Sequence, residues 1–155
     1  MILWRISNHA TLNGQGGLFA SARWHNQGRR IVYLAENPAA ALLEVLVHLE
    51  LGESLLPDSY QLLKVSVADT VSRERVEASD LPSGWEDDQS VTRRVGDRWL
   101  SAAASALLGV PTAIIPETCN WLLNPLHTDA VGVRIEWSRR YPYDGRLLRT
   151  GRPLR

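Results

Sequence analysis

The chain has 155 residues, of which 45% are hydrophobic and 22% are charged, which suits one globular domain and excludes a disordered chain. Its formal net charge is zero, so no overall field attracts nucleic acid, and we expect no direct nucleic-acid binding. Cys119 is the only cysteine, which excludes an internal disulfide.

No segment has the features of a membrane span or a secretion signal. The longest apolar run is interrupted by Glu44 and His48 and is shorter than the roughly 20 residues that a span needs. The N-terminal stretch carries Arg5 inside its only apolar patch and has no cleavage signature. We therefore expect a cytoplasmic protein that does not contact the membrane.

The predicted elements alternate between strands and helices. From the N-terminus they are a strand at 2–6, a loop at 8–17, a strand at 29–35, a helix at 37–52 and a strand at 59–69. They continue with a loop at 78–90, a helix at 88–109 weakened near Gly96, a strand at 111–116, an irregular turn at 117–127, and strands at 131–137 and 141–148. This pattern predicts an α+β fold with about six strands and two substantial helices, in a single domain.

The first helix has clear ends and an unexpected carboxylate. Asn37 suits the N-cap, Pro38 the first turn and Gly52 the C-terminal cap. Its residues are apolar on nearly all sides, which predicts a buried helix, yet Glu44 lies in its middle. Because an uncompensated buried charge is costly, Glu44 is either paired with an arginine or held at the wall of a ligand cleft. Alanines on its own face would leave room for a ligand.

Arg23 and Tyr33 are further candidates for a binding site. The guanidinium of Arg23 suits a phosphate or carboxylate, and Tyr33 offers an aromatic face on the strand that precedes the helix of Glu44. Each could instead be structural. Six arginines follow Ser138 and form either a solvated basic tail or a contact for an acidic partner.

Familiar catalytic motifs are absent from the sequence. It contains no nucleophile elbow, P-loop, dinucleotide-binding glycine motif or zinc-protease motif. The four histidines lack metal-ligand spacing, so no metal site is expected. His48 could pair with Glu44 one turn earlier, but we expect it to be a core histidine. An RNase that uses His25 and His127 remains an alternative.

Four ordered blocks resemble the RES domain family, the toxins of bacterial Xre–RES toxin–antitoxin pairs. The blocks are LWRIS, ARWHNQGRRIVYLAENPAAALLEVLVHLE, GVPTAIIPETCNWLLNPLH and YPYDGRLL. The resemblance implies that residues 1–155 form a RES domain with an ADP-ribosyltransferase-like mixed β-sheet core and flanking helices. It also implies a toxin that degrades NAD⁺ or transfers its ADP-ribose to protein, and a cognate Xre-type antitoxin as its partner.

The resemblance assigns roles to particular residues. It places Glu44, Arg23 and Tyr33 in the catalytic set, and Arg5, Arg23, Tyr33, Thr112 and Asn120 at NAD⁺, with no metal. Asn120 and Asn124 could instead only fix their turn. The chain departs from the family where Thr112 replaces a serine, His25 an asparagine and Trp121 a tyrosine.

Three functions follow from these assignments. The first is a toxin that cleaves the nicotinamide–ribose bond of NAD⁺ by hydrolysis or phosphorolysis and arrests growth. The second is a mono-ADP-ribosyltransferase toxin that modifies a host protein. The third is a non-catalytic protein-binding module in which Glu44 is simply paired and the arginine-rich tail docks a partner.

Overall fold

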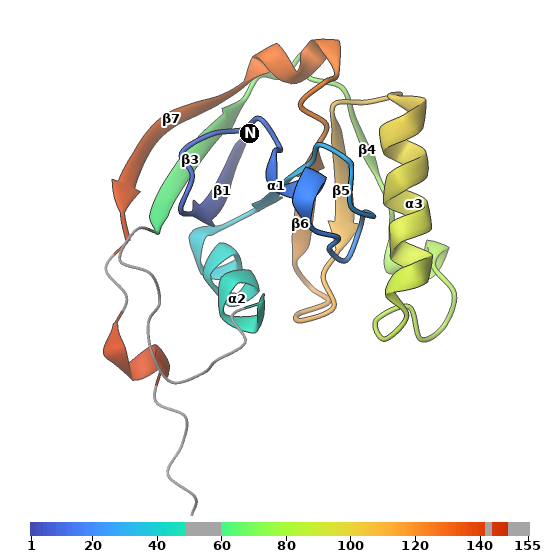
Figure 1. Ribbon diagram of the computed structural model, residues 1–155, viewed down its shortest axis with the longest axis horizontal. Coiled ribbons are helices and arrows are strands. Elements are labelled where there is room, and N and C mark those ends of the chain that lie inside the picture. The colour runs from blue at the N-terminus through green and yellow to red at the C-terminus, as the bar shows by residue number, and fades with distance from the viewer. Residues whose placement is uncertain (49–59, 142–143, 149–155) are drawn as a thin grey trace, which may run out of the picture.

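The computed structural model describes residues 1–48, 60–141 and 144–148. Within these residues, seven strands form one sheet in the order β4-β5-β6-β2-β1-β3-β7 (Figure 1). The strands are β1 Ile2–Ser7, β2 Val32–Ala35, β3 Gln61–Val67, β4 Arg73–Arg75, β5 Leu107–Pro111, β6 Cys119–Leu123 and β7 Val133–Arg140. Among the described strands, only β4 and β5 pair in parallel, so the sheet is mixed.

Three α-helices and three short 3₁₀ segments accompany the described strands. The helices are α1 Gly16–Phe19, α2 Pro38–His48 and α3 Gln89–Ala102, and the 3₁₀ turns are Ala78–Asp80, Thr128–Gly132 and Gly145–Leu148. None of the helices in the described part of the chain is long and apolar enough to cross a membrane. The predicted α+β class is confirmed.

The two long helices pack on one face of the sheet. Successive strand residues point to opposite faces, so Tyr33 and Ala35 of β2 share a face with their neighbours on β6. On this face α2 packs over β1 and β2, and α3 packs beside β5 and β6, where Trp99 joins Leu108 and Leu122. The opposite face carries a separate cluster that includes Leu3, Val32, Leu34, Leu63, Val65 and Leu107.

Gly96 lets a long loop approach α3 closely. A Cβ atom at this position would lie 1.8 Å from the carbonyl oxygen of Trp24. The hydroxyl of Thr92 on the same helix donates to the carbonyl of Arg23. The glycine that weakens the helix in the sequence is therefore the point where residues 23–25 are fixed against α3.

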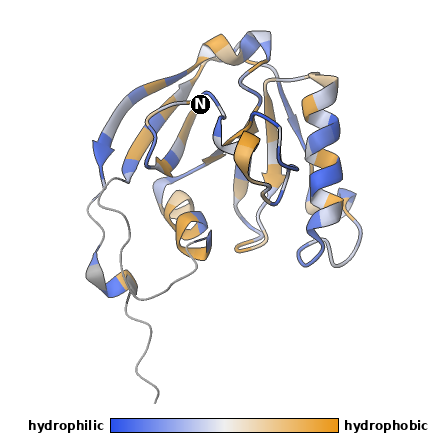
Figure 2. Cartoon of the chain, in the orientation of Figure 1, coloured by the Kyte–Doolittle hydropathy of each residue, from blue (hydrophilic) through white to orange (hydrophobic). Residues whose placement is uncertain are grey.

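The helix α2 is less buried than its sequence predicts. Only Ala40 and Ala41 are buried, whereas Val47 and His48 are exposed. Figure 2 shows hydrophobic residues along much of α2, whereas α3 is largely hydrophilic. The prediction of burial on all sides is wrong, because this short helix lies on the surface of the sheet and contacts it through one stripe. The predicted end at Gly52 lies outside the described residues.

The region after residue 88 differs most from the prediction. The helix α3 ends at Ala102, since Ala103 adopts a left-handed conformation, and residues 107–109 belong to the buried strand β5. The strand predicted at 111–116 keeps only Pro111, and the turn predicted at 117–127 contains β6. A short apolar run fits a strand or a helix equally well, and its sheet neighbours decide which forms.

The edges of the sheet also depart from the prediction. The strands predicted at 2–6, 59–69 and 131–137 are present with shifted ends, as β1, β3 and β7, and the strand predicted at 29–35 forms only from Val32. The three-residue strand β4 has no apolar alternation and was not predicted. In the strand predicted at 141–148, the described residues 145–148 form a 3₁₀ turn instead.

Candidate active site

The sheet opens between its two central strands. β1 pairs with β2 only through Trp4 and Ala35, whereas β1 pairs with β3 at six positions and β2 with β6 at four. Beyond this single pair, residues of both strands line a cavity of about 330 Å³. This volume lies within the range typical of small-molecule sites. Its remaining walls come chiefly from α2 and from Asn120 of β6.

Glu44 lies on the wall of this cavity. The buried residues Ala40 and Ala41 set α2 against β1 and β2, and Ala41 itself lines the cavity beside Glu44. The carboxylate accepts a hydrogen bond from Nδ2 of Asn120 at 2.6 Å, and the side chain keeps 28% of its exposure. The carboxylate is thus held by an amide donor while it stays accessible from the cavity.

Asn120 comes from the segment that the sequence analysis treats as an irregular turn. It lies in β6 opposite Ala35 of β2, and only 8% of its surface is exposed. Its Oδ1 is buried without a hydrogen-bond partner among the described residues. Asn124, by contrast, fixes the following turn, because its Oδ1 accepts from the N–H of Leu126.

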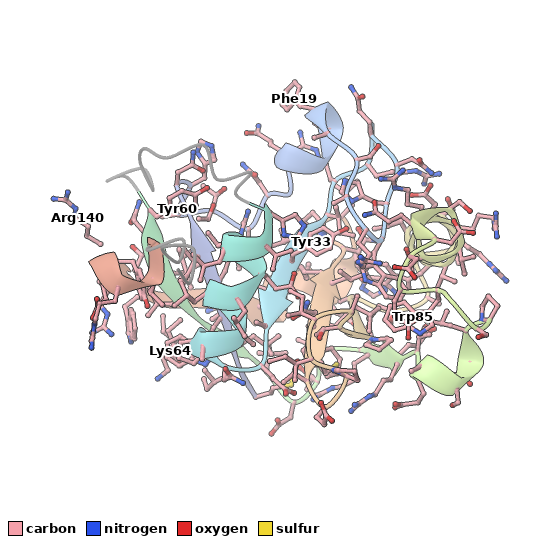
Figure 3. All side chains as sticks on the ribbon, turned by 90° about the horizontal axis from the view of Figure 1, so that it is seen from below. Phe19, Tyr33, Tyr60, Lys64, Trp85 and Arg140 are labelled. Carbon is pink, nitrogen blue, oxygen red and sulfur yellow. The ribbon has the colours of Figure 1, made fainter. Side chains whose placement is uncertain are left out.

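Tyr33 lines the cavity, and its hydroxyl is hydrogen-bonded to two residues that do not line it. Figure 3 places the side chain of Tyr33 beside α2. The hydroxyl accepts from the backbone N–H of Trp24 at 3.1 Å and lies 2.8 Å from Nδ1 of His25. Burial raises the pKa of the Tyr33 phenol well above its ordinary value. Tyr33 therefore offers the cavity a neutral aromatic surface.

His25 supports Tyr33 from behind. Its Nε2 lies 3.0 Å from the carbonyl of Ala20, which can only accept, so Nε2 carries the proton and Nδ1 accepts from the Tyr33 hydroxyl. His25 is only 2% exposed, and this burial lowers its pKa. The histidine that replaces the family's asparagine is thus a neutral structural partner of Tyr33.

Arg5 brings positive charge to the cavity. It lines the cavity from β1, and its guanidinium donates to the carbonyl of Thr11 at 2.9 Å. Among residues 1–48, 60–141 and 144–148, no carboxylate forms an ion pair with Arg5. Burial lowers the pKa of Arg5, but arginine remains protonated in proteins. Its remaining N–H groups suit an anionic ligand group.

Arg23 and Thr112 lie elsewhere in this structure. The guanidinium of Arg23 donates to the carbonyl of Glu86 at 2.8 Å, in the loop before α3, and Arg23 does not line the cavity. The hydroxyl of Thr112 donates to the carbonyl of Ile115 and accepts from its N–H, which closes the turn between β5 and β6. The roles that the resemblance gives these two residues at NAD⁺ stay predictions.

His48 and Trp4 also line the cavity, and their sequence context did not predict a place there. His48 is not a core histidine, because its side chain is 63% exposed at the cavity and its Nδ1 lies 2.6 Å from the carbonyl of Glu44. Nδ1 also lies 3.9 Å from the Glu44 carboxylate, so the expected spacing of one turn does bring them together. Trp4 precedes Arg5 in β1, and nothing in its local pattern separates it from a core tryptophan.

Other candidate chemistry finds no support in the described part of the chain. No group of three or more histidine, cysteine, aspartate or glutamate side chains there could hold a metal ion. His25 and His127 belong to different hydrogen-bond networks, the first with Tyr33 and the second with Asp129. The cavity between β1 and β2 is therefore the candidate active site.

Comparisons with known proteins agree along nearly the whole chain. Residues 2–144 match the family described as "RES domain". A relative from Pseudomonas putida named "Toxin Res" is 46% identical over 148 residues, which cover 96% of this chain and 100% of the relative. A relative from Sphingobium sp. named "Prs ADP-ribosylating toxin" is 37% identical over 156 residues, which cover 94% of this chain and 96% of the relative.

A solved structure shares the fold. A chain of the crystal structure of the M. tuberculosis MbcT–MbcA toxin–antitoxin complex matches with a TM-score of 0.72 and 16% identity, over 90% of this chain and 83% of that chain. At this identity the likeness concerns the fold alone. It agrees with the ADP-ribosyltransferase-like mixed sheet with flanking helices that the resemblance implies.

Proposed function

Because this chain belongs to the RES domain family, we propose that it is a toxin of a toxin–antitoxin system that consumes NAD⁺ by cleaving its nicotinamide–ribose bond. The names of its relatives in Pseudomonas putida and Sphingobium sp. support a toxin, and the second name supports ADP-ribose chemistry. The observation that carries the proposal is the Glu44 carboxylate, held by Asn120 on a cavity wall that also includes Arg5.

The proposed role of Glu44 follows from the transition state of the reaction. The bond between nicotinamide and ribose breaks through a positively charged, oxocarbenium-like state, as in glycoside hydrolysis. A carboxylate beside the ribose stabilises this charge and binds the 2-hydroxyl more tightly as the charge develops. Glu44 is the carboxylate that lines the cavity among the described residues, so we assign it this role.

The other cavity residues would bind and orient the dinucleotide. Arg5 would donate charge-assisted hydrogen bonds to the diphosphate. The ring of Tyr33 would pack against the nicotinamide or the ribose, since its hydroxyl is already engaged. Positively charged nicotinamide leaves as a neutral molecule, so the reaction needs no metal. Arg23 and Thr112 would reach the ligand only through a change in their present contacts.

Turnover of NAD⁺ tests the proposal directly. Purified protein is incubated with NAD⁺, and nicotinamide release is followed with and without inorganic phosphate. We expect release by the wild type and a loss of about 10²-fold or more with Glu44→Gln, which keeps the side-chain shape and an acceptor for Asn120. No release by the wild type, or full release by Glu44→Gln, would contradict the proposal. A dependence on phosphate would identify phosphorolysis.

Transfer of ADP-ribose to a protein is the second candidate function. It is favoured by the name of the Sphingobium relative, "Prs ADP-ribosylating toxin". Incubation of the toxin with labelled NAD⁺ and a bacterial extract distinguishes the two functions. A labelled protein band that disappears with Glu44→Gln would support transfer, and release of free ADP-ribose without such a band would support cleavage.

We propose a cognate antitoxin of the Xre type as the partner and the cytoplasm as the site of action. The solved neighbour is a toxin–antitoxin complex, which supports an antitoxin partner. Expression of the chain alone should arrest bacterial growth, and co-expression with the protein encoded next to it should restore growth. A non-catalytic binding module predicts instead that Glu44→Gln leaves arrest unchanged.

A further inference from the structure

The two polar atoms of the Asn120 side chain differ in their hydrogen bonding. Its Nδ2 donates to Oε1 of Glu44 at 2.6 Å, whereas its Oδ1 is buried without a partner among the described residues. An unpaired buried acceptor lowers stability, so its presence needs an explanation. The explanation lies in the carboxylate, because rotating the amide by half a turn would bring Oδ1 against Oε1, and two acceptors repel.

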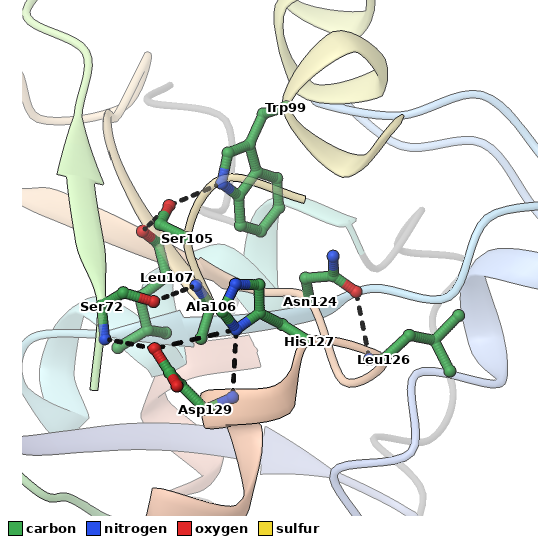
Figure 4. A network of polar contacts seen from close by, with 9 residues as sticks. All are labelled: Ser72, Trp99, Ser105, Ala106, Leu107, Asn124, Leu126, His127 and Asp129. Carbon is green, nitrogen blue, oxygen red and sulfur yellow. Dashed lines mark hydrogen bonds and ion pairs between the residues drawn. The ribbon is translucent and has the colours of Figure 1, made fainter. Parts of the chain in front are cut away.

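The strand itself does not require an asparagine at this position. The backbone of Asn120 pairs with Ala35 on one side and with Val110 on the other, as any strand residue would. Asn124 shows what a structural asparagine does in the same segment. It is 4% exposed, and its Oδ1 caps the turn by accepting from the N–H of Leu126 (Figure 4). The amide of Asn120 serves no such local turn.

We propose that Asn120 is the positioning residue for Glu44, which deepens the function proposed above and rests on it. Its Nδ2 fixes one carboxylate oxygen, Oε1, and restricts the rotamers of a side chain that reaches the cavity from one turn of α2. Among the described residues, the second oxygen, Oε2, has a contact with Nδ1 of His48 at 3.9 Å, and we assign it to the ribose hydroxyl. The unpaired Oδ1 lowers the stability of the folded protein, and this loss accompanies the positioning of Glu44.

The first test separates positioning from a structural role. Asn120→Leu removes the donor and the unpaired acceptor together and keeps a similar shape. We expect kcat for NAD⁺ to fall by about 10²-fold, as for a misplaced catalytic group, while KM stays at the wild-type value. The midpoint of urea unfolding should equal or exceed that of the wild type. Asn124→Leu is the matched control, and it should lower the unfolding midpoint while kcat per folded molecule is unchanged.

The second variant changes the pH dependence. Asn120→Asp is isosteric but places a carboxylate against Glu44, and two carboxylates in contact do not ionise independently. We expect the activity to be lost at neutral pH and to recover in part at acidic pH, where the two groups share one proton and a hydrogen bond forms again. A purely structural asparagine predicts no such change in the shape of the pH profile.

Nuclear magnetic resonance tests the contact without reference to activity. The side-chain amide signals of Asn120 should shift as the Glu44 carboxylate is protonated in the wild type, and this shift should be absent in Glu44→Gln. Wild-type kcat in Asn120→Leu, or a loss of kcat matched by a loss of stability, would overturn the positioning role and leave the proposed function intact. If the wild type does not consume NAD⁺, the proposed function fails. Amide signals of Asn120 that do not shift when Glu44 is protonated would then overturn this inference as well.

Discussion

The hydroxyl of Tyr33 donates its proton to Nδ1 of His25, 2.8 Å away, and accepts from the backbone N–H of Trp24. Both the donor and the acceptor function of the hydroxyl are therefore used by residues that do not line the cavity. The relationship joins the cavity wall on β2 to the loop that Gly96 holds against α3. The ring of Tyr33 and its hydroxyl therefore have different roles, the ring at the cavity and the hydroxyl in holding the loop.

Removal of this hydroxyl should affect stability and not binding. Tyr33→Phe leaves Nδ1 of His25 and the N–H of Trp24 without their partner, which should lower the free energy of unfolding by about 1–3 kcal/mol. The ring remains, so KM and kcat for NAD⁺ should stay near wild-type values. Urea unfolding and nicotinamide release measure the two effects. A higher KM at unchanged stability would instead show that the hydroxyl contacts the ligand.

The neutral form of His25 makes stability depend on pH. Burial lowers the pKa of His25 below the ordinary value of 6.5 in the folded protein, and the nearby charges of Asp97 and Arg93 on α3 act in opposite directions. As the pH falls below 6.5, the unfolded chain therefore takes up a proton that the folded chain refuses, and stability decreases. This part of the stability is present above that pH and is lost on acidification.

The variant His25→Asn isolates this contribution. It removes the titrating ring and introduces asparagine, the usual residue at this position in the RES domain family. The unfolding free energy measured in urea should decrease less steeply with acidification in His25→Asn than in the wild type. Equal slopes in the two proteins would show that protonation of His25 is not coupled to folding.

Arg5 should contribute to binding only through the phosphates of the ligand. Arg5→Gln removes a cation from the cavity wall, and the loss of a charge-assisted hydrogen bond should raise KM for NAD⁺ by about tenfold to a hundredfold. Nicotinamide riboside has the same scissile bond but no phosphate, so its cleavage should be unaffected. Arg134→Gln is the control, since Arg134 is exposed and donates to the carbonyl of Val131. Equal losses with both substrates would place Arg5 outside the diphosphate site.

A variant of Arg23 distinguishes the NAD⁺-binding role that the resemblance assigns from the contact with Glu86 in the structure. Its guanidinium donates to the carbonyl of Glu86, so Arg23→Ala should loosen the loop against the segment before α3 and lower stability. Activity should then fall by the same factor with NAD⁺ and with nicotinamide riboside. A loss confined to NAD⁺ would show that Arg23 turns toward the diphosphate when the ligand binds. Both outcomes can be read from the same two assays.

Local patterns in the sequence predict well where one pattern is dominant. The alternating apolar residues of 61–67 form β3. The cap signals at Asn37 and Pro38 mark the start of α2, where the side-chain Oδ1 of Asn37 accepts from the N–H of Ala40. They fail at 107–111 and 119–123, where short apolar runs have no period of their own. These runs become strands because they pair with each other and because the second run also pairs with β2. Such pairing between distant segments is not contained in local patterns.

The candidate site divides in the same way. Glu44 could be found from its chemistry, because a carboxylate in an apolar helix stands out at any position. Its partner could not, since Asn120 is 76 residues away and sits in a segment with little regularity. Arg23 has the right chemistry for a phosphate, but its side chain follows the loop that packs on α3, and so it lies away from the cavity in this structure.

The α+β class, the helix that carries Glu44 and the membership of the RES domain family could all be predicted from the sequence. These depend on residue types, their spacing and their order, which are all local or collinear properties. The tertiary structure alone decided that the sheet opens beside the Trp4–Ala35 pair and that Asn120 holds Glu44 there. Those features arise from packing between distant segments, where the register of strands fixes which side chains meet.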